Sequence, residues 1–321
     1  MQRILWLVTL ALPLSAQVKI VQQGNEKVSV EIDGKPFTDF WIGPETNKPY
    51  LSPLRTASGA IVTRGFPMVA DVPGEAHDHP HHRGLWFTHG NVNGYDFWGN
   101  EESQKGANKG KGKVVLKRID KVTSGKTGTI DSTFEWKIPT GQTLLRESRK
   151  MTFYSEPQVR TIDFDITLSP EEVVTFGDTK EGMFAIRLAS GLEEDQPKDI
   201  AEPKRTGKIV NAQNKMTEKN VWGKRSEWVD CSGLLDGQSF GVAIFDYPAN
   251  PRYPTYWHAR GSGLLASNIF GVHDFEKDNR DASLTIQPGQ PLRFRYRVLI
   301  HPGDAGAAGL RDRYARYSVI K

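Results

Sequence analysis

Histidine side chains gather in one short stretch of this 321-residue chain. Five of the eight histidines lie between Glu75 and Trp98, interleaved with aspartate, arginine, asparagine and aromatic residues. Imidazole is the side chain that most readily binds a metal ion or exchanges a proton near neutral pH. Such a density predicts a functional site. The five residues are His77, His79, His81, His82 and His89.

Three interpretations of this stretch are open from its residue types. Imidazole together with carboxylate suits zinc, manganese or iron, and an open coordination position would make such an ion catalytic. The standard His-Glu-x-x-His spacing is missing, however. A metal-free acid–base site and a purely structural cluster therefore stay open beside the metal. If one divalent metal ion is bound, we expect His79 and His82 to be among its ligands.

Two further clusters lie far along the chain. Glu181 stands beside Lys180 and precedes the apolar run Met183 to Leu188, so a buried Glu181 would be the best general base. The alternative is a surface carboxylate paired with Lys180. His258 lies in the phrase Tyr-Trp-His-Ala-Arg-Gly. The residues predicted to be catalytic are His79, His81, His82, Glu181 and His258.

Aromatic residues beside the polar clusters indicate the ligand class. Flat aromatic faces next to aspartate, asparagine, arginine and histidine suit a sugar, which offers C–H faces and many hydroxyl groups. For any single tryptophan the alternative is core packing. The residues predicted to bind substrate are Arg64, Asp78, Arg83, Trp86, His89, Asn93, Asp96, Trp98, Trp257 and Arg260.

The elements that must position these residues are strands. Gln158 to Leu168 and Leu292 to Ile300 alternate apolar and polar residues, as half-buried strands do. The arginines of the second run are predicted to form a solvated face, with anion binding as the alternative. Phe240 to Phe245 is apolar enough to be covered on both faces. The one convincing helix lies within Ala307 to Tyr317.

These strand patterns predict an all-β protein. The natural arrangement is a large antiparallel β-sandwich, with the galactose mutarotase supersandwich as a candidate architecture, and a short C-terminal helix. No internal repeat or long linker divides the chain after residue 16, so we expect one domain over residues 17–321. The polar segment Glu193 to Lys219 is predicted to be a surface loop, with a lid as an alternative.

Residues 1–16 match a secretory signal peptide: a basic start, an apolar run from Ile4 to Leu14, and Ser15-Ala16 before Gln17. We therefore expect a secreted or periplasmic protein with no membrane segment after cleavage. The balance of 42 basic against 38 acidic residues does not suggest a nucleic-acid partner. The single cysteine, Cys231, excludes an intramolecular disulfide.

Seven short segments, most of them rich in charged or imidazole side chains beside glycines or aromatic residues, carry a resemblance: Arg64–Met68, Asp78–Phe87, His89–Gly90, Val92–Gly94, Asp96–Trp98, Lys180–Met183 and Trp257–Arg260. Together they resemble the PmoA-like domain family, a bacterial domain of unknown function labelled methane oxygenase PmoA. The resemblance runs from about Pro49 to about Asp304. It implies a role in carbohydrate processing, in bacteria rich in polysaccharide-degrading genes. It implies no methane chemistry, because that chemistry belongs to a membrane-embedded subunit.

We therefore expect an exported protein that acts on a small-molecule or oligosaccharide substrate. The reaction would be hydrolysis, elimination or epimerisation of a sugar or sugar derivative, each of which needs an acid and a base. One alternative is a non-catalytic periplasmic sugar-binding module. Another is a redox metalloprotein whose metal ion is held by histidines.

Overall fold

The computed structural model describes residues 17–104 and 109–320. The predicted signal peptide, residues 1–16, lies outside the described residues. Within the described part of the chain, no helix combines the length and the apolar character that a membrane crossing requires.

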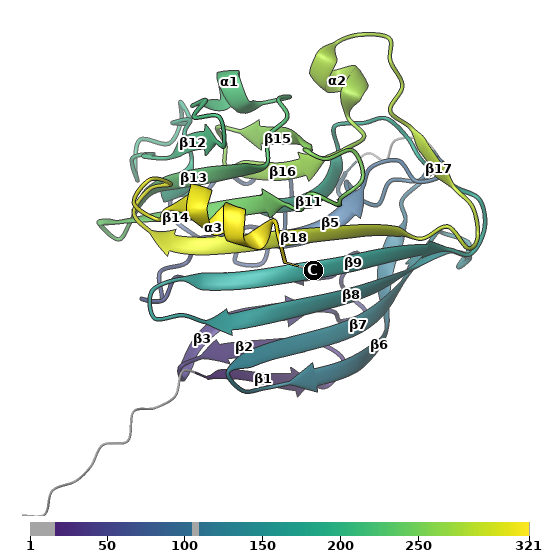
Figure 1. Cartoon of the computed structure of the whole chain (residues 1–321), viewed down its shortest axis with the longest axis horizontal. Helices are drawn as coiled ribbons and strands as arrows, with labels where there is room; N and C mark the ends of the chain where they lie inside the picture. Colours follow the sequence, from purple (N-terminus) through teal and green to yellow (C-terminus); the bar gives the residue numbers. More distant parts are fainter. Residues whose placement is uncertain (1–16, 105–108, 321) are drawn as a thin grey trace, which may run out of the picture.

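Two eight-stranded sheets form the molecule (Figure 1). In the first sheet, which we call the site sheet, the strands follow the order β1-β2-β3-β4-β5-β11-β16-β15. Their bounds are β1 Val18–Gln23, β2 Lys27–Ile32, β3 Lys35–Trp41, β4 Tyr50–Leu51, β5 Leu85–His89, β11 Gly182–Arg187, β16 Leu264–Asn268 and β15 Tyr256–Arg260. Neighbouring strands of this sheet pair antiparallel.

The second sheet, which we call the packing sheet, has the order β12-β13-β14-β18-β9-β8-β7-β6. Its strands are β12 Lys208–Asn211, β13 Trp228–Leu235, β14 Gln238–Asp246, β18 Leu292–Pro302, β9 Arg160–Pro170, β8 Thr143–Ser155, β7 Thr127–Lys137 and β6 Lys113–Thr123. A two-stranded ribbon joins β10 Val174–Phe176 to β17 Leu284–Ile286. The helical segments are η1 Ser190–Leu192, α1 Glu218–Val221, α2 Val272–Glu276 and α3 Leu310–Tyr317.

Alternation along the strands builds the core between the sheets. In β7 every second residue is buried, which is the period-two pattern of a half-covered strand. Aromatic rings from both sheets meet in this core: Phe40 lies 6.0 Å from Phe134 and Phe164 lies 4.8 Å from Phe184 between ring centroids. Each such buried ring stabilises the fold by about 1.5–3 kcal/mol. The predicted all-β sandwich is confirmed.

Strand β14 is covered on both faces, as its apolar sequence predicted. Val242 and Ile244 belong to the core between the sheets, whereas Ala243 and Phe245 pack on the other side. That second side is covered by α3, through Leu310 and Tyr317. The predicted C-terminal helix is therefore confirmed, and it shields the outer face of the packing sheet (Figure 1).

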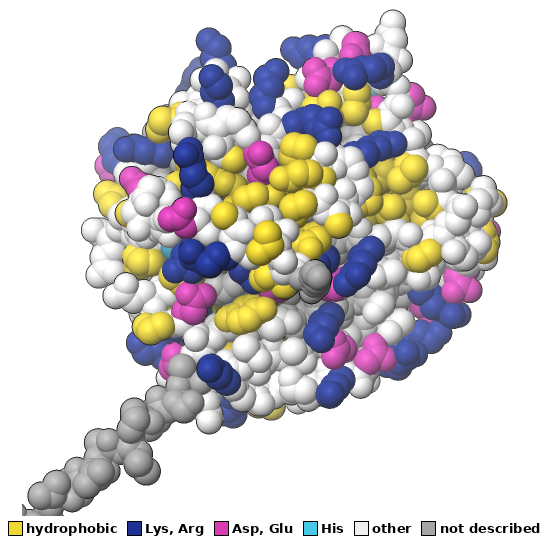
Figure 2. All heavy atoms as spheres, in the orientation of Figure 1, with side chains coloured by type: hydrophobic (Ala, Val, Ile, Leu, Met, Phe, Trp, Pro, Cys, Tyr) yellow, Lys and Arg dark blue, Asp and Glu magenta, His cyan; other side chains and the backbone are white. Residues whose placement is uncertain are grey.

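Two of the three arginines in the row on β18 have aspartate partners on a neighbouring strand. Arg297 and Arg293 pair with Asp163 and Asp165 of the neighbouring strand β9 at 2.6 and 2.5 Å. On the face shown in Figure 2, basic and acidic side chains are interspersed. The side chain of Arg293 is 60% exposed, but that of Arg297 is only 15% exposed and lies 4.7 Å from the ring centroid of Tyr317 in α3. The prediction of a solvated strand face therefore holds for Arg293 and is wrong for Arg297.

The polar segment Glu193 to Lys219 is not a simple surface loop. It contains β12 and the start of α1. Its first residue, Glu193, is buried and accepts a hydrogen bond from Arg205 Nε at 2.7 Å. The prediction of a surface loop holds for most of residues 194–207 and is wrong for Lys208–Asn211, which pair with β13 as the edge strand of the packing sheet.

Candidate acid–base site

A cavity of about 460 Å³ lies against the site sheet. Its walls come from four parts of the chain: the histidine-rich loop before β5, the segment Asp96 to Gln104 after β5, the segment that leads into β11 with Arg187 at its end, and β15 with the turn that follows it. The volume is within the usual range for small-molecule sites. The cavity brings together eight of the residues predicted from sequence: His79, His81, His82, Asp96, Trp98, Glu181, His258 and Arg260.

Period-two alternation puts the site on the outward face of its sheet. In β15, Trp257 and Ala259 enter the core between the sheets, so His258 between them faces the other way. The register pairs His258 with Ala266 of β16. Leu264, two residues before Ala266, is on the same outward face and lines the cavity.

The histidine-rich loop is held in a tight, constrained turn. His79 has a φ of +46°, which is uncommon for a residue with a side chain. The amide of His82 donates to the carbonyl of His79 at 2.9 Å, which closes the turn. Gly84 ends it at a φ of +54°, where a Cβ atom would lie 2.1 Å from the Leu51 carbonyl oxygen. Only glycine fits at this position.

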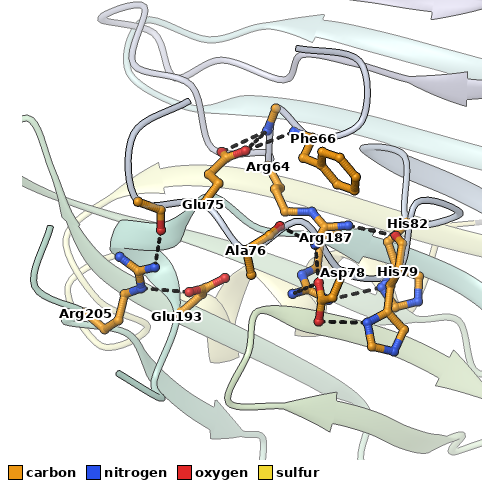
Figure 3. Close-up of polar contacts among 12 residues, drawn as sticks. Arg64, Phe66, Glu75, Ala76, Asp78, His79, His82, Arg187, Glu193 and Arg205 are labelled. Carbon is orange, nitrogen blue, oxygen red and sulfur yellow. Dashed lines mark hydrogen bonds and ion pairs between the residues drawn. The ribbon is translucent and has the colours of Figure 1, made fainter. Parts of the chain in front are cut away.

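Asp78 anchors the loop from behind (Figure 3). Its Oδ1 accepts hydrogen bonds from Arg64 at 2.6 Å and Arg187 at 3.3 Å, and its Oδ2 lies 2.8 Å from Nδ1 of His79. The hydrogen bond from His79 and the charges of the two arginines hold the pKa of Asp78 well below its usual range. Asp78 thus acts as a fixed carboxylate that orients His79, with the Nε2 atom of His79 left for chemistry.

His258 is fixed by the segment that carries Glu181. Its Nδ1 lies 3.1 Å from the carbonyl oxygen of Lys180, an atom that can only accept. The proton of neutral His258 is therefore on Nδ1, and Nε2 carries a lone pair. Burial lowers the pKa of His258 to about 4, against the opposing effect of Glu181. A neutral imidazole with its proton on Nδ1 can accept a proton at Nε2.

His81 and His82 are also neutral imidazoles. Burial lowers the pKa of His81 to about 2, and burial together with the neighbouring His81 and Arg187 holds the pKa of His82 well below its usual range. Their ring centroids are 4.2 Å apart. Among the residues that the structure describes, the buried Nδ1 atom of His81 has no hydrogen-bond partner. Both rings line the cavity as polar but uncharged groups.

Glu181 lies in the cavity wall but is not buried. Its side chain is 35% exposed and Oε1 lies 3.0 Å from Nζ of Lys180. The expected desolvation is therefore missing, and the interpretation of Glu181 as a carboxylate paired with Lys180 is the one that the structure supports. Burial makes Lys180 harder to protonate, but Glu181 outweighs this and raises the pKa of Lys180.

Several residues predicted to bind substrate have structural roles instead. Arg64 is buried and donates to Asp78 and to the His79 carbonyl. Arg83 makes two hydrogen bonds to Glu101. His89 is buried with Nε2 against the Gly177 carbonyl. Asn93 binds backbone atoms of Val173 and Thr175.

The tryptophans do not form a sugar platform. Trp257 is fully buried and its Nε1 donates to the Ser226 carbonyl at 2.8 Å. Trp86 and Trp98 are each 1% exposed; Trp86 stacks beneath His82 with a centroid distance of 5.2 Å. The expectation of open aromatic faces was wrong because Trp257 lies in the core between the sheets, whereas Trp86 and Trp98 pack against the imidazoles of His81 and His82.

The metal prediction requires at least three converging ligands. In the described residues, 17–104 and 109–320, no group of three or more histidine, cysteine, aspartate or glutamate side chains is arranged to hold an ion. The Nδ1 atoms of His79 and His82 face Asp78 and Arg187 respectively. The predicted pair His79 and His82 therefore lacks a third ligand in this geometry.

Sequence reasoning missed Arg187, which lines the cavity and contacts both Asp78 and His82. The signal that could have revealed it is an arginine at the end of the apolar strand Gly182–Arg187, because a charged residue is rarely fully buried unless it is paired. Further lining residues outside the predicted site are Gly99, Gln104, Lys180, Ser262 and Leu264.

A family model matches residues 27–315, and its description is a family of unknown function, DUF6807. The chain belongs to this family. The resemblance to the PmoA-like family was therefore wrong, since DUF6807 is the family whose model covers these residues. No curated protein shows significant sequence similarity to the chain.

Solved structures with a related arrangement include a galactose mutarotase-like protein from Clostridium acetobutylicum. It is 11% identical, with 89% of this chain and 98% of that chain covered at a TM-score of 0.40. A galactose mutarotase related enzyme from Lactobacillus acidophilus is 11% identical, with 89% of this chain and 98% of that chain covered at a TM-score of 0.29. The α-galactosidase from Lactobacillus brevis is 8% identical, with 91% of this chain and 40% of that chain covered at a TM-score of 0.37.

Proposed function

We propose that this chain is an enzyme that removes a proton from a ring carbon of a sugar derivative, as an epimerase or a lyase does. The supporting observation is the fixed protonation pattern of His258, whose Nδ1–H is committed to the Lys180 carbonyl. Its Nε2 is thereby an acceptor in a polar cavity. General-base catalysis requires such a group within reach of the proton that it takes.

The wall opposite His258 supplies the hydrogen-bond donors for the substrate oxygen atom on which negative charge develops. Adjacent strands are about 4.8 Å apart, so β15 and β11 lie about 10 Å apart across β16. In the proposed complex, one sugar ring lies between His258 on β15 and the imidazoles near Arg187 on β11, which line the same cavity. Neutral imidazoles that donate hydrogen bonds stabilise a developing oxyanion.

The cavity favours proton abstraction over glycoside hydrolysis. Hydrolysis ordinarily needs two free carboxyl groups on either side of the bond. Of the two carboxylates that line the cavity, Asp96 accepts backbone hydrogen bonds from Trp98 and Gly99 at 2.8 Å each. Glu181 is paired with Lys180. Both bonds to Asp96 are made to Oδ1, and burial raises the pKa of Asp96. The cavity therefore offers one candidate acid and not the two free carboxyl groups of a glycosidase.

Solvent deuterium exchange tests this proposal. The purified chain is incubated in D₂O with a panel of keto-sugars, aldoses and uronic acids, and C–H loss or α,β-unsaturated product is followed by proton NMR. We expect wild-type protein to act on at least one class, and His258→Gln to lose this activity. His77→Gln is the matched control, because His77 belongs to the same loop but does not line the cavity.

The result also separates the enzyme from a sugar-binding module. Saturable binding of a sugar by wild-type protein, with no exchange or turnover across the panel, would reject the enzymatic proposal. Equal activity in wild-type protein and His258→Gln would reject His258 as the base.

A further inference from the structure

Arg187 is a buried cation placed between two groups of the site. It ends β11 and its side chain is 2% exposed. Nη1 lies 3.1 Å from Nδ1 of His82, and Nη2 lies 3.3 Å from Oδ1 of Asp78 (Figure 3). One guanidinium group therefore spans both the imidazole and the carboxylate.

The contact with His82 has only one chemically allowed direction. A guanidinium group has five N–H donors and no acceptor. Burial lowers the pKa of Arg187 to about 10, so the group is still charged at neutral pH. Nδ1 of His82 must therefore accept the hydrogen bond, and the single proton of the neutral ring must be on Nε2.

The ring of His82 is also held in this orientation. It stacks on Trp86 on one side, with a centroid distance of 5.2 Å and an interplanar angle of 22°. On the other side it stacks on His79 at 4.9 Å and 12°. A ring flip would leave a buried arginine donor facing a carbon atom, which costs about 1–3 kcal/mol for the lost partner.

We infer that Arg187 is a positioning residue that holds His82 as a neutral Nε2–H hydrogen-bond donor. His82 then cannot be the base of the site. Within the proposed function, on which this part rests, His82 donates to an oxygen atom of the substrate while His258 takes the proton. The two histidines have opposite roles because their Nδ1 atoms face opposite partners: a donor for His82 and a carbonyl acceptor for His258.

A lysine could not substitute for Arg187 in this role. The guanidinium fork contacts Asp78 and His82 through two different nitrogens, whereas an ammonium group is a single point charge. Arg187→Lys therefore keeps the charge beside Asp78 but loses the fixed donor at His82. Arg187→Met removes both contacts at a similar side-chain length.

Imidazole ¹⁵N NMR of the full chain at neutral pH tests the inference without any substrate. The His82 signals are assigned by their loss in His82→Gln. We expect wild-type His82 to be almost entirely the Nε2–H tautomer. In Arg187→Lys and Arg187→Met, the Nδ1–H tautomer should appear as a substantial fraction, because water can then accept a proton from Nδ1.

His89 is the internal control for these spectra. Its Nε2 faces the Gly177 carbonyl, so its tautomer is fixed by a contact that lacks Arg187, and it should not change in either variant. Wild-type His82 with its proton on Nδ1, or with both nitrogens protonated, would overturn the inference. An unchanged His82 tautomer in a folded Arg187→Met protein would do the same.

The measurement on wild-type protein decides the tautomer even if both arginine variants fail to fold. It is also independent of turnover. If wild-type His82 is the Nε2–H tautomer and the sugar panel shows no exchange, the proposed function fails while the positioning role of Arg187 stands.

Discussion

At the scale of single residues, the site is defined by where each imidazole proton lies. His258 must be unprotonated at Nε2 to act as the base, and burial lowers its pKa to about 4. We therefore expect kcat/KM for the identified sugar to be flat between about pH 5 and 8 and to fall as pH drops through about 4. An acid limb near the ordinary histidine pKa would contradict this assignment.

The variant His258→Gln tests the same residue in another way. Removal of a general base typically lowers the rate by about 10²–10⁴-fold. The loss should appear in kcat/KM with little change in the unfolding midpoint. Retained activity in His258→Gln beside a normal midpoint would mean that another group is the base.

Asp78 gives a prediction about stability as well as activity. Asp78→Ala leaves Arg64 and Arg187 without their shared carboxylate and frees the ring of His79. Unpaired buried donors cost about 1–3 kcal/mol. We expect a loss of this size in the free energy of urea unfolding, whereas Asp71→Ala in the nearby loop, a residue without such partners among the described contacts, should change it by less than about 0.5 kcal/mol.

At the scale of elements, a buried ion pair crosses strand β14. His301 of β18 and Asp230 of β13 are joined at 3.0 Å with both side chains fully buried. Gly241 of β14 lies between them, and a Cβ atom there would be 2.4 Å from Cε1 of His301. Gly241→Ala should therefore break the pair and cost about 3 kcal/mol of unfolding free energy. A cost below about 1 kcal/mol would show that the strands shift easily.

The same pair makes stability depend on pH. Burial lowers the pKa of His301, but Asp230 outweighs this and the pKa is raised above 6.5. Burial also raises the pKa of Asp230. Both shifts mean that the folded state holds its protons more tightly than the unfolded state. The contribution of His301 is therefore fully present below pH 6.5 and is lost as pH rises through the raised pKa of His301. The contribution of Asp230 is lost at lower pH, as pH rises from 3.8 through the raised pKa of Asp230.

A double variant isolates this effect. Lys48, whose pKa burial lowers to about 7, titrates in the same range, so the pair is best measured as a difference. We expect the stability difference between wild-type protein and Asp230→Asn/His301→Gln to shift against wild type from about pH 6 to about pH 9. A constant difference across this range would contradict the assignment.

Strands illustrate what could and could not be predicted from sequence. Alternation of apolar and polar residues was sufficient to predict strands β9 and β18, and the apolar stripe was sufficient to predict helix α3. Both succeed because burial of one face imposes a period on the sequence. It did not reveal which face carries the site. Trp257 and His258 are neighbours in sequence, yet one enters the core and the other the cavity. The sequence around Trp257 and His258 is compatible with either side chain facing the core. Only the pairing register of β15 with β16 shows which of the two faces the cavity.

At the scale of the whole molecule, the C-terminal helix closes the second face of the packing sheet. Tyr317 is 2% exposed and packs near Phe245 with a centroid distance of 5.9 Å. Tyr317→Ala should lower the unfolding free energy by about 3–5 kcal/mol, as expected for loss of a large buried ring. Val319→Ala is the control, because Val319 is 74% exposed. Equal effects of the two substitutions would mean that α3 is not part of the cooperative fold.

The order of the strands has a last consequence. β15 is the outermost strand of the site sheet, whereas β5, next to the histidine-rich loop, is an interior strand. Outermost strands open in local fluctuations that leave the interior folded. Native-state hydrogen exchange should therefore release the amides of Tyr256–Arg260 before those of Leu85–His89. In mild denaturant, the strand that carries His258 would unfold first. The proposed activity would then be lost while most of the sandwich is still folded.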